Sequence, residues 1–426
     1  MKANASGQGQ VIIVGAGPVG LAAALSLKER GIPTEVLERD DRPGTHSYAL
    51  ALHPSTVRQL RQWGLLDAVR GQSLQVKKIL FYDAKQPRYE LDFDAIPGLE
   101  EGLHVLGQDH LERTLLEPLK AGGVPIRWSH RLSRFEDQGD AVKLELERLS
   151  ESMSGYAMAR LEWHVDKEIS RHADYMIGAD GHFSLVRRRM GIAFPKVAPT
   201  QSFAVFEFKT DFAHENTARV VFGPQGTSIL WPLPGGFCRW GFEIEESSAD
   251  AISREKDRLF VQVGAHGYHA LEAGSLDHFL EERAPWFTGE VGPFRWRMVV
   301  RFERRLVGKF GSGRVWLAGD AAHLAAPIGM QSMNVGIQEG YQLGQALADI
   351  LEERKPSSVL EAYGRAREEE WQALLGMETA LRPRGETDPF VAENSDKMMA
   401  CLPASLETLP LFAEHLRMDL LGSTRT

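Results

Sequence analysis

The residues most informative about chemistry are three glycines and a carboxylate near the N-terminus. Gly15, Gly17 and Gly20 follow an apolar run, and Glu38 stands eighteen residues after the last glycine. Glycines in this G-x-G-x-x-G spacing permit a tight turn, close approach of the backbone to a pyrophosphate, and close packing of the next helix. A carboxylate at the tip of the second strand can accept hydrogen bonds from the hydroxyls of an adenosine ribose. The pattern therefore predicts an adenine dinucleotide site, without distinguishing NAD from FAD.

The residues around this fingerprint predict the elements that position it. The run 11–14 is apolar throughout, as expected for a strand that is buried on both faces. Pro18 suits the first turn of a helix, because its missing N–H is not needed there. Gly31 and Pro33 end that helix, and residues 34–37 predict the second strand.

Composition and charge narrow the classes of protein. The chain has 426 residues, enough for two or three domains, and 43% of them are hydrophobic, which allows a large core. Its formal net charge of −9 argues against a general affinity for nucleic acid or anionic lipid. No segment approaches the ~20 apolar residues of a membrane helix, so we expect no integral membrane segment.

Cysteines and histidines give no indication of a metal centre. Cys238 and Cys401 lie far apart in the sequence, with neither metal-ligand spacing nor a disulfide framework. His266 and His269 are spaced i, i+3, but no acid or third ligand stands near them. We therefore expect no metal, and the two thiols favour a reduced, cytoplasmic setting.

Hydrophobic patterning predicts an α/β fold with two interleaved domains. Apolar and charged residues alternate over 142–147 and 159–165, as in an antiparallel hairpin with one wet face. An aromatic, strand-like stretch covers 202–245, and a polar helix is expected over 253–263. We expect a Rossmann-like framework (1–74, 105–196 and 309–375), interrupted by a β-rich substrate domain (75–104 and 197–308) and followed by a C-terminal helical segment (376–426). A pocket is expected where the domains meet.

Two further carboxylates stand at the ends of predicted strands. Asp180 follows an apolar run, with Ser184 and Arg187 just beyond it and the arginine within reach of a phosphate. A helix start capped by Asp and Ser explains that motif equally well. Asp320 ends another apolar run, and a loop leads from it to a helix whose free N-terminal N–H groups would stabilise negative charge. A strand–turn–helix connection without a ligand is the alternative there.

Together these three motifs resemble those of the class A, p-hydroxybenzoate hydroxylase-like, FAD-dependent monooxygenases. The resemblance covers residues 10–375; it is specific in the motifs and loose in the β-rich insertions. It implies non-covalently bound FAD, NAD(P)H as co-substrate, and O2, which adds to the reduced flavin as a C4a-hydroperoxide. The expected activity is hydroxylation or epoxidation of an aromatic or polycyclic small molecule, inside a closed and largely apolar pocket.

The resemblance assigns roles around the nucleotide half of the cofactor. The residues expected against the ADP half of FAD are Gly15, Gly17, Gly20, Glu38 and Arg39. Asp180 and Arg187 match a motif associated with both the FAD pyrophosphate and NAD(P)H. Gln108 matches a glutamine near the flavin, and Arg113 matches an arginine that binds the flavin phosphate.

The resemblance also assigns roles around the flavin ring. Asp320, which follows Gly319, would bind the ribityl or ribose hydroxyls. The residues expected to border the isoalloxazine are Pro327, Gly329, Met330 and Asn334. No catalytic residue is assigned beyond Pro327 and Gly329 as flavin-edge candidates, and His323 is expected to fix the loop beside the flavin.

The sequence departs from the family pattern at two places. Met330 and Ser332 stand where many members have glycine, and methionine adopts a positive φ only at a cost, so we expect a loop of different shape. Tyr48 stands at or near a position where many members have an arginine that contacts the cofactor. The mobility of the flavin, or the approach of NAD(P)H, is expected to differ accordingly.

Aromatic residues of the β-rich insertions are candidates for the wall of the substrate pocket. They are Tyr82, Phe206, Phe222, Trp231, Phe242 and Trp296. Ordinary packing in the core of a sheet is the alternative for each of them. Tyr82, His53 and Arg239 are candidates for assisting deprotonation of a phenol, and the sequence does not choose between them.

Two other functions compete with the monooxygenase. A flavin-dependent halogenase or a reductase would use the same fold, but no Trp-x-Trp-x-Ile-Pro sequence is present, and Lys77 and Lys78 are more simply a solvated strand start. A non-catalytic nucleotide-binding module is the third candidate. The expected partners are an aromatic or polycyclic substrate and O2, with no nucleic acid, in a monomer or homodimer.

Overall fold

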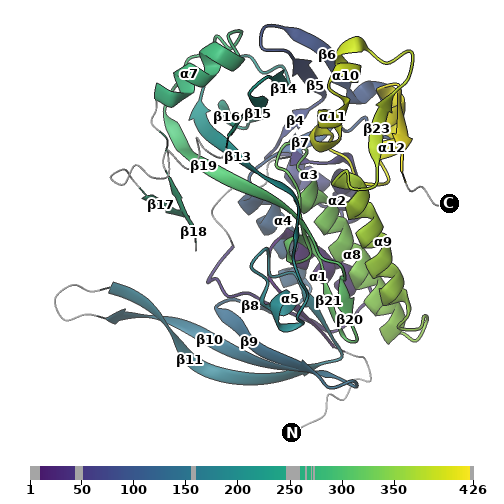
Figure 1. The fold of residues 1–426 in the computed structure, drawn as a ribbon. Helices are drawn as coiled ribbons and strands as arrows, with labels where there is room; N and C mark the ends of the chain where they lie inside the picture. The colour runs from purple at the N-terminus through teal and green to yellow at the C-terminus, as the bar shows by residue number, and fades with distance from the viewer. Residues whose placement is uncertain are drawn as a thin grey trace.

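The computed structural model describes residues 10–43, 51–154, 160–245, 260–263, 266–269, 271 and 274–422. Two large sheets organise these residues (Figure 1). A six-stranded sheet carries the glycine fingerprint, and an eight-stranded sheet collects strands from both predicted β-rich insertions. None of the helices in these ranges has the length and apolar character needed to span a membrane.

The six-stranded sheet forms the expected framework. Its order is β20-β21-β12-β1-β2-β8. β1 (Val11–Val14) pairs in parallel with β2 (Thr34–Leu37) on one side and β12 (Tyr175–Gly178) on the other, and all three strands are buried. The first two strands confirm the predicted boundaries. The sheet is completed by β8 (Ile126–Arg127), β21 (Val315–Leu317) and β20 (Gly311–Ser312).

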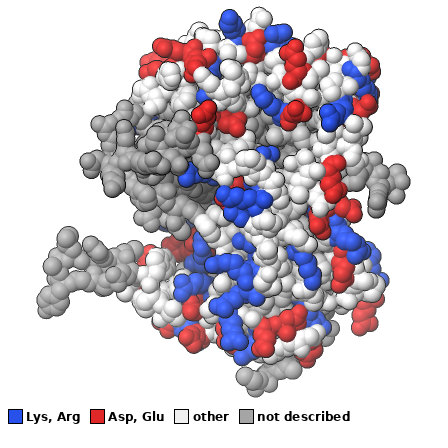
Figure 2. Space-filling model, viewed as in Figure 1, with Lys and Arg blue, Asp and Glu red and all other residues white. Residues whose placement is uncertain are grey.

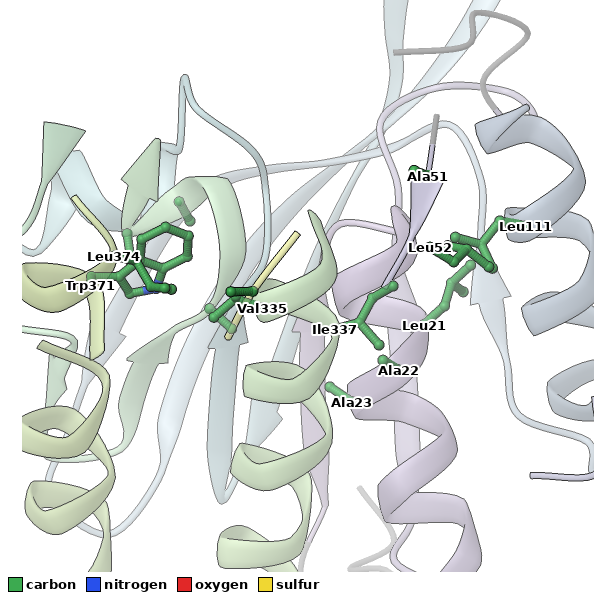
Figure 3. Packing of buried hydrophobic residues seen from close by; sticks show 14 of the residues in the cluster. Leu21, Ala22, Ala23, Ala51, Leu52, Leu111, Val335, Ile337, Trp371 and Leu374 are labelled. Carbon is green, nitrogen blue, oxygen red and sulfur yellow. The ribbon is translucent and has the colours of Figure 1, made fainter. Parts of the chain in front are cut away.

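Two helices from opposite ends of the framework pack against each other. They are α1 (Pro18–Glu29), which starts at the fingerprint, and α8 (Gln331–Leu351), which follows the third motif. Figure 3 shows Ala22 and Ala23 of α1 beside Ile337 of α8. Such small side chains keep the distance between two helices short.

Glycines on α8 make this approach still closer. Gly336, Gly340 and Gly344 recur every four residues and therefore form one ridge on the helix. A Cβ at Gly340 would lie 2.4 Å from the carbonyl oxygen of Val19, and a Cβ at Gly344 would lie 2.7 Å from the Cβ of Ser26. Residues larger than glycine would thus force the two helices apart.

Further short elements precede and follow these two helices along the chain. The helices are α2 (Pro54–Gln62), α3 (Leu66–Arg70), η1 (Phe93–Ala95), α4 (Gln108–Ala121), α5 (Leu185–Arg189), η2 (Gly319–Ala321) and α9 (Val359–Leu374). A small sheet of order β3-β7-β4 consists of β3 (Ala51–Leu52), β4 (Leu74–Val76) and β7 (Leu103–Val105).

The predicted hairpin is confirmed and is longer than expected. β10 (Val142–Ser154) pairs with β11 (Arg160–Ala173), and β9 (His130–Asp137) joins the other edge of β10. In Figure 1 this three-stranded sheet projects from the body of the molecule.

The eight-stranded sheet unites the two insertions, in the order β22-β19-β13-β16-β15-β14-β5-β6. Its first insertion supplies β5 (Lys78–Tyr82) and β6 (Pro87–Asp92), and β5 pairs in parallel with β14 of the second. The remaining strands are β13 (Lys196–Lys209), β14 (Thr217–Gly223), β15 (Gly226–Leu233), β16 (Phe237–Ile244), β19 (Phe294–Leu306) and β22 (His323–Leu324).

The two faces of this sheet bury different clusters, because side chains alternate along each strand. Phe203 and Val205 belong to the cluster that is continuous with the core of the framework. Ala204 and Phe206, between and beyond them, belong to a separate cluster with helix α7 (Gly274–Arg283). We call these the framework face and the α7 face.

Two expectations about secondary structure are wrong. Residues 260–263, the end of the expected polar helix, form β17 (Phe260–Val263), which pairs with β18 (His266–His269); residues 253–259 lie outside the described residues.

The C-terminal segment is not entirely helical. Besides α10 (Pro389–Glu393), α11 (Ser395–Cys401) and α12 (Leu409–His415), it contains the antiparallel strands β23 (Ala380–Pro383) and β24 (Met418–Leu421). In both places a strand forms because a second segment pairs with it, and that pairing is not visible in the sequence.

The contact between α1 and α8 leads to a test of stability. Gly340→Ala places a methyl group against the Val19 carbonyl, so we expect a loss of about 1–3 kcal/mol from overpacking. Urea or thermal unfolding measures this change. Gly274→Ala in α7 is the matched control, because no atom lies within 4 Å of its added Cβ, and it should be neutral or slightly stabilising. Equal stability of the two variants would contradict the close packing of α1 and α8.

Candidate functional site

The glycine turn between β1 and α1 has the geometry expected of a pyrophosphate site. Gly15 has φ +109°, and a Cβ there would lie 2.2 Å from the carbonyl oxygen of Ala179. A Cβ at Gly20 would lie 2.0 Å from the carbonyl oxygen of Gly15, whereas a Cβ at Gly17 would meet nothing within 4 Å. Gly17 caps α1 without any side-chain hydrogen bond. The first and third glycines thus serve packing, and the second leaves open space at a positive helix end.

Glu38 points back across this turn. Its Oε2 accepts a hydrogen bond from the Ala16 N–H at 2.8 Å, and its Oε1 accepts one from the Asp40 N–H at 3.1 Å. Burial raises the pKa of Glu38, while these backbone donors act in the opposite direction. Arg39 is exposed and lies 3.5 Å from the Asp40 carboxylate. Glu38 therefore stands where a carboxylate could meet a ribose beside the glycine turn.

Asp320 carries a partly buried carboxylate in this structure. It follows β21 in η2, and burial raises its pKa. Among the described residues, no hydrogen bond or ion pair to its carboxylate is formed. Gly319 has φ +66°, and a Cβ there would lie 2.8 Å from Val19 Cγ2, so this turn lies against the start of α1. A carboxylate that is partly removed from water is stabilised by hydrogen-bond donors, so the site fits a ligand that carries hydroxyl groups.

A buried network holds this turn in place. Glu339 of α8 accepts hydrogen bonds from the Gly319 N–H at 2.8 Å, from His323 Nε2 at 2.8 Å and from Trp371 Nε1 at 2.6 Å. Burial works to raise the pKa of Glu339, but the neighbouring His323, the charge of Arg367 and the Gly319 N–H hold the pKa below its ordinary value. His323 stacks on Trp371 with ring centroids 3.7 Å apart, so it fixes the loop, as expected. Sequence reasoning missed Glu339, although an acid on the buried face of α8 was a detectable signal.

The loop before α8 accommodates methionine in a left-handed conformation. Met330 has φ +51° and ψ +34° and is the N-cap of α8. Met330 thus adopts the left-handed conformation that favours glycine, at some cost in strain, and whether the loop differs in shape from that of the family stays a prediction. Ser332 Oγ accepts a hydrogen bond from the Ala325 N–H at 3.0 Å. A Cβ at Gly329 would lie 2.8 Å from the carbonyl oxygens of Ala400 and Leu402, so the C-terminal segment packs directly on this loop.

Asn334 holds the loop before α8 in place through four hydrogen bonds. Its Nδ2 donates to the carbonyl oxygens of Ala51 and Met330, and its Oδ1 accepts from the His53 N–H and from Thr56 Oγ1, all at 2.8 Å. The side chain is fully buried. All four hydrogen-bonding positions of this amide are used by the protein, so Asn334 is a positioning residue and does not offer its amide to the isoalloxazine.

His53 completes this attachment. Its Nε2 donates to the carbonyl oxygen of Gly329 at 2.8 Å, which makes Nε2 the protonated nitrogen. Burial lowers the pKa of His53 to about 3, so the ring is neutral around pH 7. This contact assigns His53 to the support of the loop rather than to deprotonation of a phenol.

The residues around Asp180 form a capped helix start, which is the simpler of the two interpretations of this motif. Asp180 accepts hydrogen bonds from Ser184 Oγ at 2.5 Å and from the Leu185 N–H at 2.6 Å, and thus caps α5. Arg187 is 6% exposed and donates to the carbonyl oxygens of Ala321 and His182, both at 2.8 Å. Its guanidinium lies 3.9 Å from the centre of the Phe194 ring. This arginine joins α5 to the Asp320 turn, and its burial argues against a direct contact with NAD(P)H.

The two candidates on α4 lie near its N-terminus. Gln108 Nε2 donates to Glu112 Oε1 at 2.8 Å. Arg113 is exposed and pairs with Asp109 at 3.1 Å. The structure gives neither a contact with the glycine turn, and their roles toward the flavin stay predictions. Tyr48 lies outside the described residues.

Only half of the wall candidates lie on the framework face. Phe222 and Trp231 are part of the framework cluster, and Trp296 packs against it. The other three, Tyr82, Phe206 and Phe242, belong to the cluster on the α7 face. A pocket between the domains therefore excludes these three, because alternation along the strands turns them away. The alternation was visible in the sequence, but which face meets the framework was not.

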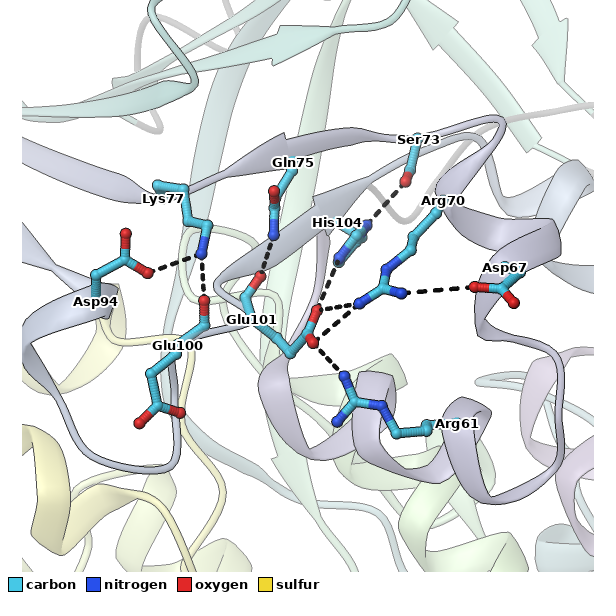
Figure 4. Close-up of polar contacts among 10 residues, drawn as sticks. All are labelled: Arg61, Asp67, Arg70, Ser73, Gln75, Lys77, Asp94, Glu100, Glu101 and His104. Atoms are coloured by element: carbon cyan, nitrogen blue, oxygen red, sulfur yellow. Dashed lines mark hydrogen bonds and ion pairs between the residues drawn. The ribbon is translucent and has the colours of Figure 1, made fainter.

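A basic surface hollow between α2, α3 and β4 is a separate feature (Figure 4). Its Arg70 pairs with Glu101 at 2.9 Å, Arg61 pairs with the same carboxylate, and Lys77 pairs with Asp94 at 2.7 Å. Lys78 pairs with Glu90 at 2.7 Å. The two lysines are thus engaged in surface ion pairs, as the simpler interpretation of the strand start expects.

The environment of His53 predicts a pH dependence of stability. His53 is neutral in the folded protein down to about pH 3, whereas in the unfolded chain it takes up a proton below pH 6.5. The unfolded state therefore binds more protons in that window, and stability falls as the pH falls, by at most about 1.4 kcal/mol per pH unit from this group. His53→Gln keeps a donor for Gly329 but does not titrate, so its loss of stability below pH 6.5 should be shallower.

Urea unfolding at a series of pH values measures this difference. His278→Gln is the control, because His278 lies exposed on α7 with 76% of its side chain accessible. That variant should keep the slope of the wild type. A His53→Gln variant with the same slope as the wild type would contradict the assignment of a neutral, buried His53.

Proteins similar in sequence to this chain include a monooxygenase and a hydroxylase. 6-Methylpretetramide 4-monooxygenase of Streptomyces rimosus is 30% identical over 367 residues, which cover 84% of this chain and 59% of that protein. 3-(3-Hydroxy-phenyl)propionate/3-hydroxycinnamic acid hydroxylase of Mycolicibacterium smegmatis is 27% identical, with 93% and 65% covered. The chain thus spans less than two thirds of the length of these two relatives.

The fold is also shared with a solved structure over nearly the whole chain. p-Nitrophenol 4-monooxygenase from Pseudomonas putida superposes with a TM-score of 0.69 at 21% identity, covering 96% of this chain and 97% of that one. The family model of the FAD binding domain matches residues 8–377, a range that includes the glycine turn, Glu38, Asp320 and the loop before α8. The chain therefore belongs to the FAD-binding domain family of the p-hydroxybenzoate hydroxylase-like flavoproteins, and FAD is its cofactor.

Proposed function

We propose that this protein is an FAD-dependent, NAD(P)H-consuming monooxygenase that hydroxylates or epoxidises an aromatic or polycyclic small molecule. The observation that carries the proposal is the partly buried carboxylate of Asp320, which has no partner among the described residues and lies beside the open helix end at Gly17. Two chemically different halves of one dinucleotide fit this arrangement: hydroxyl groups at Asp320 and a pyrophosphate at Gly17. The similarity to two characterised hydroxylases supports the reaction class.

In this proposal the cofactor supplies the redox chemistry, and the protein positions the cofactor. FAD, when bound, accepts hydride from NAD(P)H and activates O2. Gly15, Gly17, Gly20 and Glu38 would hold its ADP half, and Asp320 its hydroxyl-bearing chain. The loop Pro327–Met330 would border the isoalloxazine ring. His53 and Asn334 hold this loop in shape by donating hydrogen bonds to its Gly329 and Met330 carbonyl oxygens.

The framework face of the eight-stranded sheet would form the wall opposite the flavin. Phe222 and Trp231 supply apolar surface there, and each is at most 6% exposed. Such a surface excludes water from the reaction. The C-terminal segment contributes as well, because the Phe390 ring of α10 lies 6.0 Å from the ring of Phe222.

NAD(P)H would dock transiently, because the glycine turn that fits a dinucleotide is assigned to FAD. Figure 2 shows Lys and Arg side chains gathered through the middle of one face, although the formal net charge is −9. A positive surface of this kind attracts the diphosphate of a nicotinamide nucleotide. We further propose a cytoplasmic location, since Cys238 and Cys401 are buried and unpaired.

Removal of the Asp320 carboxylate should weaken flavin binding. Asp320→Ala loses a charged hydrogen-bond acceptor, so we expect the affinity for FAD to fall about ten- to hundredfold. Titration of the apoprotein with FAD measures this change directly. Asp349→Ala is a matched control, because this carboxylate lies on α8 but pairs with Arg30 at 2.9 Å. Wild-type affinity in Asp320→Ala would refute the assignment.

The reaction class has its own test. With an accepted aromatic substrate, the product should gain one oxygen atom, and the label should come from 18O2 rather than from labelled water. Mass spectrometry of the product decides this, together with the rate of NAD(P)H oxidation. Independence from chloride and bromide is expected; a halogenated product would instead assign the chain to the flavin-dependent halogenases.

A further inference from the structure

The hairpin of β10 and β11 extends beyond the third strand of its sheet. β9 pairs with residues 142–148 of β10, whereas β11 pairs with residues 142–154. Residues 149–154 and 160–165 therefore form a two-stranded ribbon, which we call the arm; at about 3.3 Å per residue it is about 20 Å long. Figure 1 shows the hairpin projecting from the body of the molecule. A two-stranded ribbon alone is only marginally stable in water, so the arm would be stabilised by a surface that covers it.

The apolar side of this ribbon changes from one face to the other along its length. Near the body, Val142, Leu144 and Leu146 of β10 are at most 2% exposed and belong to the core cluster of the framework. Leu149 stands three residues after Leu146, so it lies on the opposite face of the strand. The apolar residues of the arm can therefore not be covered by the core that covers the base of the same ribbon.

Trp163 and Val165 of β11 share this outer face with Leu149. The register pairs Val165 with Leu149 after a bulge, and Trp163 lies two residues before Val165 and hence on the same side. The other face of the arm is polar, with Ser150 Oγ 2.9 Å from His164 Nε2. Trp163 is 47% exposed and Val165 is 43% exposed. Large apolar side chains that gather on one exposed face mark a surface for another molecule.

Two carboxylates on the outer face give it an excess of negative charge. Glu151 lies opposite Trp163, and Glu168 lies opposite Glu147, whose own partner is Arg131 at 2.5 Å. Glu151 and Glu168 are exposed, and neither forms an ion pair with any residue that the structure describes. The apolar residues and these two acids make up what we call the arm face: Leu149, Glu151, Trp163, Val165 and Glu168.

A surface of complementary composition lies at α5. Phe183, just before this helix, is 53% exposed. Arg188 and Arg189 are exposed, and their guanidinium groups donate to the backbone carbonyl oxygens of Phe183, Ser184 and Ser133. Neither arginine pairs with a carboxylate within the described ranges. We call Phe183, Arg188 and Arg189 the α5 surface; it combines an aromatic ring with two positive charges, as the arm face combines one with two negative charges.

We propose that the arm face of one copy of this chain docks on the α5 surface of a second copy, so that two copies exchange arms about a two-fold axis. Within one copy, α5 contacts β9 at the base of the hairpin, and the arm extends away from it (Figure 1). The α5 surface that the arm meets is therefore that of the second copy. Because the contact occurs twice, it closes as a dimer and covers both pairs of surfaces. The opposite charges set the orientation of the two copies.

Sedimentation of the FAD-loaded protein over a range of concentrations measures this association. The wild type should form a dimer. Trp163→Ser removes the aromatic anchor and should raise the Kd of the dimer about tenfold or more, and added salt should raise it as well. Leu421→Ser is the matched control, because Leu421 is 51% exposed on β24 and lies on neither surface. Its dimer should have the Kd of the wild type.

Charge reversal tests whether these two surfaces meet. Glu151→Arg with Glu168→Arg, and separately Arg188→Glu with Arg189→Glu, should each abolish the dimer, because like charges then face each other. An equimolar mixture of the two double variants should form a heterodimer, because both of its contacts again pair opposite charges. Bound FAD and the far-ultraviolet circular dichroism spectrum verify that each variant is folded.

Three results would overturn the proposal. They are a wild type that stays monomeric at every concentration, a dimer whose Kd does not change with Trp163→Ser, and a mixture of folded charge variants that stays monomeric. A dimer that is lost with the arm variants but kept with the α5 variants would also overturn it, since the arms would then pack on each other.

Discussion

The close approach of α1 to α8 is the constraint on which the rest of the site depends. Val19 meets three glycines from the other end of the chain: hypothetical Cβ atoms at Gly319, Gly336 and Gly340 would all lie within 3 Å of its atoms. Because these positions lack side chains, the turn that carries Asp320 lies directly beside the helix that begins at Gly17. The two recognition elements of one dinucleotide come from distant segments, and only the helix contact brings them together. A methyl group in this contact would disturb the core and the site at once.

Buried polar residues around this contact hold loops in place rather than touching a ligand. Glu339 holds the Gly319 turn, Asn334 holds the loop of Met330, and Arg187 joins α5 to the Asp320 turn. Each of them uses its hydrogen-bonding groups within the protein, so the loops are fixed before any cofactor arrives. Such preorganisation is what a cofactor site requires when the protein contributes position and the cofactor contributes the chemistry. Asp320 differs from these residues because its carboxylate has no partner in the part of the chain that the structure describes.

Side chains alternate between the two faces of the eight-stranded sheet, so one face can form a stabilising core while the other faces the framework. Its α7 face is an aromatic core in which Trp240, Phe242 and Phe279 stack with centroids 4.8–5.0 Å apart. Its framework face carries Glu207, which forms ion pairs with Arg239 and Arg295 among aromatic residues. One strand thus serves both purposes, with successive residues such as Arg239 and Trp240 on opposite sides.

The sequence by itself determined the β1–α1–β2 unit, the acid at Glu38, the strand-borne Asp320 and the β-rich insertions, because these depend on spacing along the chain. It also contained the alternation that sorts the aromatic residues into two sets, but not which set meets the framework. The tertiary structure alone decided that choice, the strands of residues 260–263 and of the C-terminal segment, and the buried roles of Arg187 and Asn334. The physical reason is that their partners are pairing strands and backbone groups such as the carbonyl oxygens of Ala321 and Ala51. Every residue carries such a carbonyl, so the partner leaves no mark in the sequence until folding brings the two segments together.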